Sequence, residues 1–177
     1  MKHHVALASV RAGNVIGGGD WALDRIIPDC IKALEAGKGI DIRSPKAIRP
    51  WQHVLEPLSG YMLLATKMWE EPTKYCEGWN FGPRAESITP VWDVATDVIK
   101  NYGSGKLNDI SNSNVLHEAK LLMLDISKAK FQLGWEPRMN IHQCIELTVD
   151  WYKKYQNVDS IYMLCLNEIF KFTSYKK

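Results

Sequence analysis

The chain has 177 residues and a formal net charge of +2; 46% of its residues are hydrophobic and 24% are charged. This composition is ordinary for a globular protein and argues against a disordered chain, and the weak, scattered charge gives no basic stripe of the kind that binds nucleic acid. No apolar run approaches the length of a membrane span. The four cysteines form no CxxC pair, so we expect reduced thiols, no zinc site, and a cytoplasmic protein of one domain or two small ones.

The first predicted element is a buried strand over residues 5–11, because this run is apolar and rich in β-branched residues. It leads into RAGNVIGGGDW (residues 11–21), where glycines can turn the backbone and let it approach a ligand: Gly13, Gly17, Gly18 and Gly19. A strand that breaks into a glycine-rich turn before a helix is typical of a ligand crevice in an α/β sheet. We therefore expect the rest of the chain to form the walls of such a crevice.

The later elements alternate between helices and strands, which indicates an α/β protein. In chain order the pattern predicts a helix capped by Asp24 and ending near Ala36, a strand over 39–44, an extended segment over 51–54, a helix over 57–69, a strand over 78–82, a helix that starts at Thr89-Pro90 and stops at Gly103, a loop over 103–114, a strand or buried segment over 121–124, a short helix over 127–133, and a helix from Asn140 to about Tyr155. Residues 157–177 are predicted either as a packed helix or as a loose extension, so we divide the chain into residues 1–156 and a tail.

The glycine-rich turn also fits a dinucleotide fingerprint, G-x-G-x-x-[GA], over residues 17–22, with Asp41 at roughly the expected distance. Two residues argue against it. Asp20 would place a carboxylate beside the pyrophosphate, and Trp21 is bulky where the backbone should come close. We therefore favour a turn of another kind at this position.

A second candidate ligand segment is IRPWQHVLEP, residues 48–57. On an extended chain Arg49, Trp51 and His53 alternate and point to one side. A guanidinium can fork onto phosphate oxygens and an indole offers a stacking face, a combination that suits a nucleotide diphosphate. From composition alone, a surface arginine beside a packed tryptophan is the favoured alternative.

Two other patterns are weaker. Tyr102 and Lys106 have the Y-x-x-x-K spacing of short-chain dehydrogenases, in which the lysine lowers the pKa of the tyrosine. The glycines between them make a shared helix face improbable, so we interpret the spacing as coincidence. His117 is followed by a glutamate but lacks the second histidine of a zinc-binding HExxH motif.

Four segments in this order, RAGNVIGGGDW, IRPWQHVLEPLSGY, GWNFGP and LGWEPR, resemble the CDP-glucose 4,6-dehydratase family of extended short-chain dehydrogenases/reductases. The resemblance covers about residues 5–155. It implies an α/β fold, namely the last strands of a Rossmann-type sheet with a small α/β substrate-binding lobe. The glycine-rich NAD motif and a workable Y-x-x-x-K pair of that family are absent from this sequence. We therefore expect a C-terminal half that is inactive alone.

The resemblance also implies a set of binding residues. Asn14 and Arg49 would bind the diphosphate, and the segment from Arg25 would follow the base and ribose. Nucleotide-sugar residues are thus Asn14, Arg25, Ile27, Pro28, Arg49, Trp51, His53, Asn80 and His117. Residues near the NAD nicotinamide would be Arg11, Ala12 and Gly13. No catalytic or metal-binding residue is expected in this chain.

In the intact family, NAD takes a hydride from the sugar, water is eliminated, and the hydride returns, which yields CDP-4-keto-6-deoxyglucose for lipopolysaccharide or O-antigen biosynthesis. The expected partners are a CDP-glucose-like nucleotide sugar and either the missing N-terminal half or a second copy. Two alternatives stay open: a related epimerase or dehydratase that uses another nucleotide, and a non-enzymatic truncated remnant.

Overall fold

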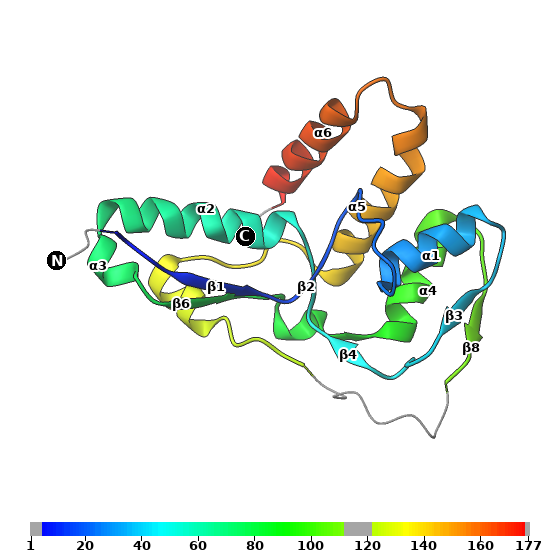
Figure 1. Ribbon diagram of the computed structural model, residues 1–177, viewed down its shortest axis with the longest axis horizontal. Helices are drawn as coiled ribbons and strands as arrows, with labels where there is room; N and C mark the ends of the chain where they lie inside the picture. Colours follow the sequence, from blue (N-terminus) through cyan, green and yellow to red (C-terminus); the bar gives the residue numbers. More distant parts are fainter. Residues whose placement is uncertain (1–4, 112–121, 176–177) are drawn as a thin grey trace.

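The computed structural model describes residues 5–111 and 122–175. Its helices pack around four pairs of short strands (Figure 1). Three pairs are parallel: β1 (Ser9–Ala12) with β6 (Gly78–Phe81), β2 (Asn14–Ile16) with β5 (Trp51–His53), and β3 (Ile40–Ile42) with β8 (Leu107–Asp109). The fourth pair, β4 (Ile48–Arg49) with β7 (Thr89–Pro90), is antiparallel. This mixture of mostly parallel pairs and helices confirms the predicted α/β class.

The described helices are α1 (Ile26–Glu35), α2 (Leu55–Glu70), α3 (Pro72–Tyr75), α4 (Val91–Tyr102), α5 (Ile141–Lys154) and α6 (Ile161–Ser174), with the short turns η1 (Ala85–Ser87), η2 (Ala129–Leu133) and η3 (Tyr155–Asn157). Four of the helices, α1, α2, α4 and α5, lie where the sequence pattern predicts them. Glycines in the left-handed region end α4 and η2 at Gly103 (φ 109°) and Gly134 (φ 67°). None of the helices within residues 5–111 and 122–175 is both long and apolar enough to cross a lipid bilayer.

Asn140 starts α5 as predicted. Its side chain accepts a hydrogen bond from the Gln143 backbone N–H at 3.0 Å, and the Gln143 side chain accepts one from the Asn140 N–H at 2.9 Å. This reciprocal capping satisfies two N–H groups that the first turn of a helix leaves unpaired. The predicted cap at Asp24 is wrong, because Arg25 is the N-cap of α1 and Asp24 has a φ of 58°.

The described residues form two hydrophobic cores. The large core lies between α1, α4 and α5 and includes the fully buried side chains of Ile31, Val98 and Ile145. The small core lies between the β1–β6 pair, α2 and η2, and is centred on Trp79 and Phe81, which are both fully buried. Figure 1 shows α2 running beside β1 and β6, apart from the helices of the large core.

Three expectations differ from the structure. Residues 5–8 have no regular structure, and Val5 among them is 78% exposed. The strand that follows is also largely exposed, with Val10 at 41%, because β6 is the only described strand that pairs with β1. The predicted loop over 103–114 contains β8, whose pairing with β3 overrides its polar composition. Residues 122–124 are irregular, and residue 121 lies outside the described ranges.

Residues 157–175 contain α6, a helix that contributes buried Leu164 and Phe172 to the large core. Arg138 lies against α6: its guanidinium carbon is 5.2 Å from the Phe172 ring centroid, and it donates to the Thr173 carbonyl at 3.3 Å. Most other apolar side chains of α6 are exposed, including Tyr162 and Phe170. The helix therefore covers α5 through a narrow contact.

Candidate nucleotide-sugar site

A cavity of about 130 Å³ lies where the β2–β5 pair meets the start of α1. It is lined by residues from one stretch of the chain, between positions 14 and 28, and by one residue distant from it in the sequence: Asn14, Val15, Ile16, Gly17, Asp20, Asp24, Arg25, Ile26, Ile27, Pro28 and Trp51. The structure thus brings together five of the nine residues for which the resemblance implies substrate binding. They are Asn14, Arg25, Ile27, Pro28 and Trp51.

Backbone pairing places Asn14 next to Trp51. The two residues are register partners in the parallel β2–β5 pair, and the Asn14 N–H donates to the Pro50 carbonyl at 2.9 Å. The bend before Asn14 needs a glycine, because a Cβ on Gly13 would lie 2.3 Å from the Pro50 carbonyl oxygen. The side chain of Asn14 is half-buried and that of Trp51 is 7% exposed, so one wall of the cavity is an amide beside an indole.

The start of α1 forms the opposite wall. Ile27 and Pro28 are buried and apolar, and Arg25 precedes the first turn without a side-chain cap. Uncapped N–H groups in the first turn of a helix can donate to a ligand. This wall therefore combines an apolar floor with backbone donors and one guanidinium.

Two carboxylates also line the cavity, and neither was predicted to bind the ligand. Asp20 lies 3.8 Å from the Nε of Arg25, and Asp24 accepts a hydrogen bond from Arg43 at 2.7 Å. Both pairs are largely exposed to solvent, so their mutual stabilisation is small. The carboxylates remain hydrogen-bond acceptors at the mouth of the cavity.

The glycine-rich loop is held by aromatic residues of α5. A Cβ on Gly18 would lie 2.1 Å from the Trp151 ring, and the Tyr152 hydroxyl donates to the Asp20 carbonyl at 2.6 Å. Trp21 packs on Tyr152 with ring centroids 5.2 Å apart. Gly17 likewise faces protein, since its Cβ would lie 2.9 Å from Val54. Gly18 thus makes room for a side chain of the protein itself, whereas Gly17 packs against Val54 and also lines the cavity.

No sequence signal pointed to Trp151 and Tyr152, because they lie about 130 positions from the loop that they support. The dinucleotide fingerprint over residues 17–22 is not supported, since the chain stays irregular until α1 begins at Ile26. The Asp41 side chain, which would have served that fingerprint, accepts a hydrogen bond from Asn108 at 2.8 Å instead.

The remaining predicted residues lie elsewhere. Arg49 does not line this cavity: it pairs with Thr89 in the β4–β7 strand pair, and its Nη1 donates to the Ile48 carbonyl at 2.9 Å. Pro50 separates Arg49 from β5, so the expected alternation over one continuous strand does not occur. Arg11 and Asn80 are register partners on β1 and β6, where Arg11 donates to Asn80 at 3.3 Å. His117 lies outside the described residues.

His53 is fully buried behind the cavity wall. Burial lowers the pKa of its imidazole to about 4, so the ring is neutral at physiological pH. Its Nδ1 accepts a hydrogen bond from the Leu55 N–H at 3.3 Å, which leaves the proton on Nε2. This Nε2 is buried and has no partner, and it lies 3.8 Å from the Cβ position of Gly17. A supporting role for His53 remains a prediction.

Two buried cysteines and the Tyr102–Lys106 pair do not form reactive groups here. Burial raises the pKa of the Cys30 and Cys144 thiols to about 12, so both stay protonated. Tyr102 is the last residue of α4, and Lys106 follows two glycines with positive φ, so the two do not share a helix face. Within residues 5–111 and 122–175, no group of three or more His, Cys, Asp or Glu side chains could hold a metal ion.

A second, larger hollow of about 360 Å³ lies beside the start of α4. It is lined by Pro45, Lys46, Pro90, Trp92, Asp93 and Asp109. None of the residues that the resemblance implicates lies in it, so we place the candidate site at the smaller cavity.

Comparison with known proteins agrees with the predicted resemblance. No family model matches the sequence. The chain is 44% identical over 173 residues to CDP-glucose 4,6-dehydratase of Salmonella typhimurium, which covers 98% of this chain and 48% of that enzyme. The chain therefore spans about half the length of the curated relative that it matches. The match also extends into residues 157–177, beyond the segments on which the resemblance was based.

Solved structures show the same fold at lower identity. UDP-glucuronic acid 4-epimerase from Bacillus cereus, in complex with UDP-glucuronic acid and NAD, matches with a TM-score of 0.69 at 22% identity over 86% of this chain and 46% of its own. dTDP-glucose 4,6-dehydratase from Bacillus anthracis, in complex with NAD, matches with a TM-score of 0.67 at 21% identity over 83% of this chain and 44% of its own. In sequence the chain is thus similar to the C-terminal half of CDP-glucose 4,6-dehydratase. In fold it matches Rossmann-type extended short-chain dehydrogenase/reductase enzymes over about half of their length.

Proposed function

We propose that this chain is the nucleotide-sugar-binding portion of an enzyme that converts CDP-glucose to CDP-4-keto-6-deoxyglucose, and that it does not turn over substrate alone. One observation carries the proposal: the cavity that brings Asn14, Arg25, Ile27 and Pro28 together with Trp51 of β5. The sequence similarity supports the same assignment. This portion contributes binding energy and orientation, which lower a reaction barrier only when the reacting groups are held beside them.

The size of the cavity indicates which part of the ligand it takes. Small-molecule sites usually have volumes of about 300–1,000 Å³, so a cavity of about 130 Å³ holds one moiety of a nucleotide sugar. Asp20 and Asp24 are each paired with an arginine, Arg25 and Arg43, and their oxygen atoms can also accept hydrogen bonds from neutral donors. The cavity therefore suits the nucleoside end of the ligand, with the diphosphate outside it.

The same carboxylates favour cytosine over other pyrimidines. Cytosine carries an N4 amino group that donates to Asp or Glu, whereas thymine presents an O4 acceptor at that position, and uracil shares this O4. A carboxylate facing O4 would pair two acceptors and weaken binding. The arrangement thus supports a CDP sugar over UDP and dTDP sugars.

The residues expected near NAD lie outside the two cavities. Arg11, Ala12 and Gly13, which the resemblance places near the nicotinamide, line neither of the two cavities. The space beside the Gly13 Cα is filled by Pro50, whose carbonyl oxygen would lie 2.3 Å from a Cβ there. We therefore assign no chemical step through NAD to these three residues.

Isothermal titration of the chain with CDP, UDP and dTDP tests the proposal. We expect CDP to bind about tenfold more tightly, the difference that one charge-assisted hydrogen bond provides. Asp20→Asn and Asp24→Asn should reduce this preference, and Asp93→Asn, in the larger hollow, serves as the matched control. Binding of UDP or dTDP without CDP would favour an enzyme for another nucleotide sugar. Turnover of CDP-glucose with NAD by this chain alone would contradict its inactivity.

A further inference from the structure

Helix α6 is attached to the rest of the chain by one of its faces. Leu164 and Phe172 are buried in the large core. Lys171 forms an ion pair with Glu146 of α5 at 3.7 Å. Positions 164, 171 and 172 have the spacing of a single helix face, so these contacts define the inner face of α6.

The opposite face of α6, here called the outer face, is apolar and open to solvent. A turn of about 100° per residue places five side chains on it. They are Tyr162, Met163, Leu166, Ile169 and Phe170. None of the five is charged, and Tyr162 and Phe170 are 71% and 68% exposed. Helices that are apolar on both sides are normally buried on both sides, and the described part of the chain leaves the outer face uncovered.

Helix α6 belongs to the part of the chain that the relative shares. The match to the Salmonella typhimurium enzyme covers 98% of the chain, which leaves fewer residues outside it than α6 contains. Figure 1 shows α6, in red, standing apart from β1 and β6. Association through the outer face is therefore separable from association through the strand edge at β1.

The outer face is symmetric about Leu166. Tyr162 and Phe170 lie four residues to either side of it, and Met163 and Ile169 lie three residues to either side. A twofold axis beside Leu166 would pair Tyr162 with Phe170 of a second copy, which gives an aromatic pair. It would pair Met163 with Ile169 in the same way. Antiparallel helices pack through such stripes at a small crossing angle, so the outer face is complementary to itself.

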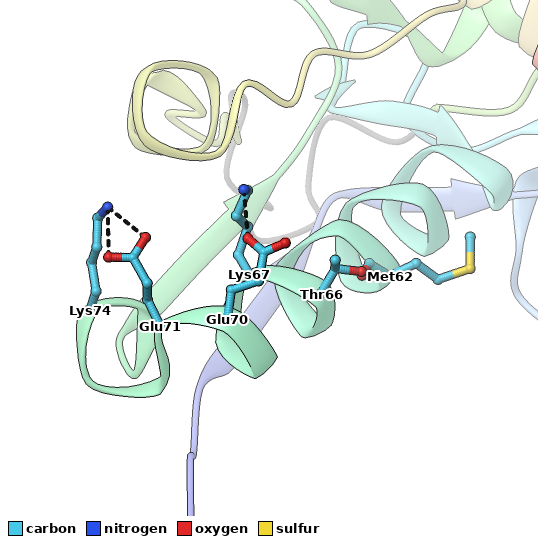
Figure 2. Close-up of polar contacts among 6 residues, drawn as sticks. All are labelled: Met62, Thr66, Lys67, Glu70, Glu71 and Lys74. Carbon is cyan, nitrogen blue, oxygen red and sulfur yellow. Dashed lines mark hydrogen bonds and ion pairs between the residues drawn. The ribbon is translucent and has the colours of Figure 1, made fainter.

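Helix α2 also exposes apolar side chains, with Met62 67% and Trp69 90% exposed. The end of this helix is charged, however, and Figure 2 shows Lys67 paired with Glu70, at 2.9 Å. An antiparallel pair of α2 helices would lay this charged end over residues 57–66 of the other copy, which carry no charge. Covering the ion pair there would cost desolvation. The outer face of α6 has no such charge, so it is the better interface.

We propose that the outer face of α6 binds the outer face of α6 in a second copy of this chain, as an antiparallel helix pair. Burial of the five side chains in both copies removes roughly 1,000 Å² of accessible surface, the lower limit for a specific interface. We therefore expect a weak, reversible dimer. A lipid surface fits less well, because it favours basic side chains around an apolar face, and Lys171, the one basic residue of α6, is paired with Glu146 on the inner face.

Analytical ultracentrifugation of the whole chain over a concentration series tests this proposal. We expect a monomer–dimer equilibrium, and Tyr162→Lys with Phe170→Lys should raise its dissociation constant about tenfold or more. The apolar contact is lost, and lysines would face each other across the twofold axis. Met62→Lys with Trp69→Lys, at similarly exposed positions of α2, is the matched control and should leave the constant unchanged.

Cross-linking locates the contact. Cys165 is exposed and Cys76 is partly exposed, so both are first replaced by serine. In that background Leu166→Cys should be joined into a covalent dimer by a short bismaleimide, because the two copies of this position lie beside the axis. Trp69→Cys on α2 should not be joined.

A chain that stays monomeric throughout the concentration series would overturn the proposal. So would an oligomer that ignores the α6 substitutions, or one that the α2 substitutions dissociate, because the contact would then lie at another surface such as the β1 edge or α2. Circular dichroism of each variant establishes that it remains folded. CDP binding is measured separately on the monomeric variant, so failure of this interface and failure of the nucleotide site give different results.

Discussion

The two hydrophobic cores of this chain differ in how completely they are enclosed. The large core lies between α1, α4 and α5, and Trp51 separates it from the cavity. The small core buries Trp79 and Phe81 equally well, but Val10 of β1 is 41% exposed at its margin. Burial of apolar area is the main stabilising term in folding, so an open margin leaves stabilisation unrealised.

The difference associates each core with a separate task. The large core positions the cavity, since α5 supports the glycine-rich loop and α1 supplies the opposite wall. The small core positions a sheet edge. The cavity beside the large core points to ligand binding, and the strand edge beside the small core points to association with another strand.

The largest expected effect comes from Trp79→Ala in the small core. Trp79 is fully buried, donates to the Tyr75 carbonyl at 3.0 Å, and has the Lys128 ammonium 4.3 Å from its ring centroid. Loss of a buried tryptophan costs about 3–5 kcal/mol in the free energy of unfolding. We expect hydrogen exchange to accelerate in β6 and α2 while Ile145 and its neighbours in α5 stay protected.

Trp79→Phe provides the control, because it keeps an aromatic ring in the core and should lose less. Equal acceleration of exchange in α2 and α5 would break the comparison, since it would mean that the two cores unfold as one cooperative unit.

A smaller effect is expected from Gly18→Ala in the loop beside the cavity. The added Cβ would meet the Trp151 ring at 2.1 Å, and such overpacking costs about 1–3 kcal/mol. Since the loop carries Asp20, we expect CDP affinity to fall with stability. Gly37→Ala is the control: its φ of 65° makes an alanine strained by about 1–2 kcal/mol, but it has no atom within 4 Å and lies far from the loop, so CDP affinity should not change.

Local sequence signals predicted most of the fold. The helix from Asn140, its reciprocal cap, and the stops at Gly103 and Gly134 depend on neighbouring residues, so the sequence contains them. The parallel pairing of β3 with β8 depends on residues 67 positions apart, and the polar composition of β8 concealed it.

Parts of the candidate site could likewise be predicted from the sequence, and other parts could not. The sequence predicts the glycine-rich turn but not why Gly18 must be a glycine, because Trp151 reaches Gly18 only through the tertiary fold. Asp24 was taken for a helix cap, although it lies at the mouth of the cavity with its backbone in the left-handed region. Residue types predict local hydrogen bonds, whereas the composition of a cavity depends on which distant segments pack together.

The smallest expected effect concerns the cover that α6 places on the large core. Burial raises the pKa of Glu168 to about 7, and the nearby Asp150 carboxylate adds to the shift, while Lys171 and Lys154 oppose it. Lys171 is also held by Glu146 of α5 at 3.7 Å. In the unfolded chain this carboxyl titrates near its ordinary value of 4.5. Between about pH 4.5 and pH 7 the folded state therefore binds this proton more tightly than the unfolded chain does.

Stability from this proton is fully present below about pH 4.5 and is lost as the pH rises through about 7. We therefore expect the melting temperature to fall by a few degrees between pH 5 and pH 8, measured by calorimetry, with hydrogen exchange rising first in α6. Glu168→Gln should flatten this dependence, because the amide stays neutral, whereas Glu70→Gln on exposed α2 should leave it unchanged. A melting temperature that rises over this range in the wild type, or a slope that Glu168→Gln retains, would show that α6 does not bury this carboxyl in solution. In that case the large core would also have an open side, and its contrast with the small core would be one of degree.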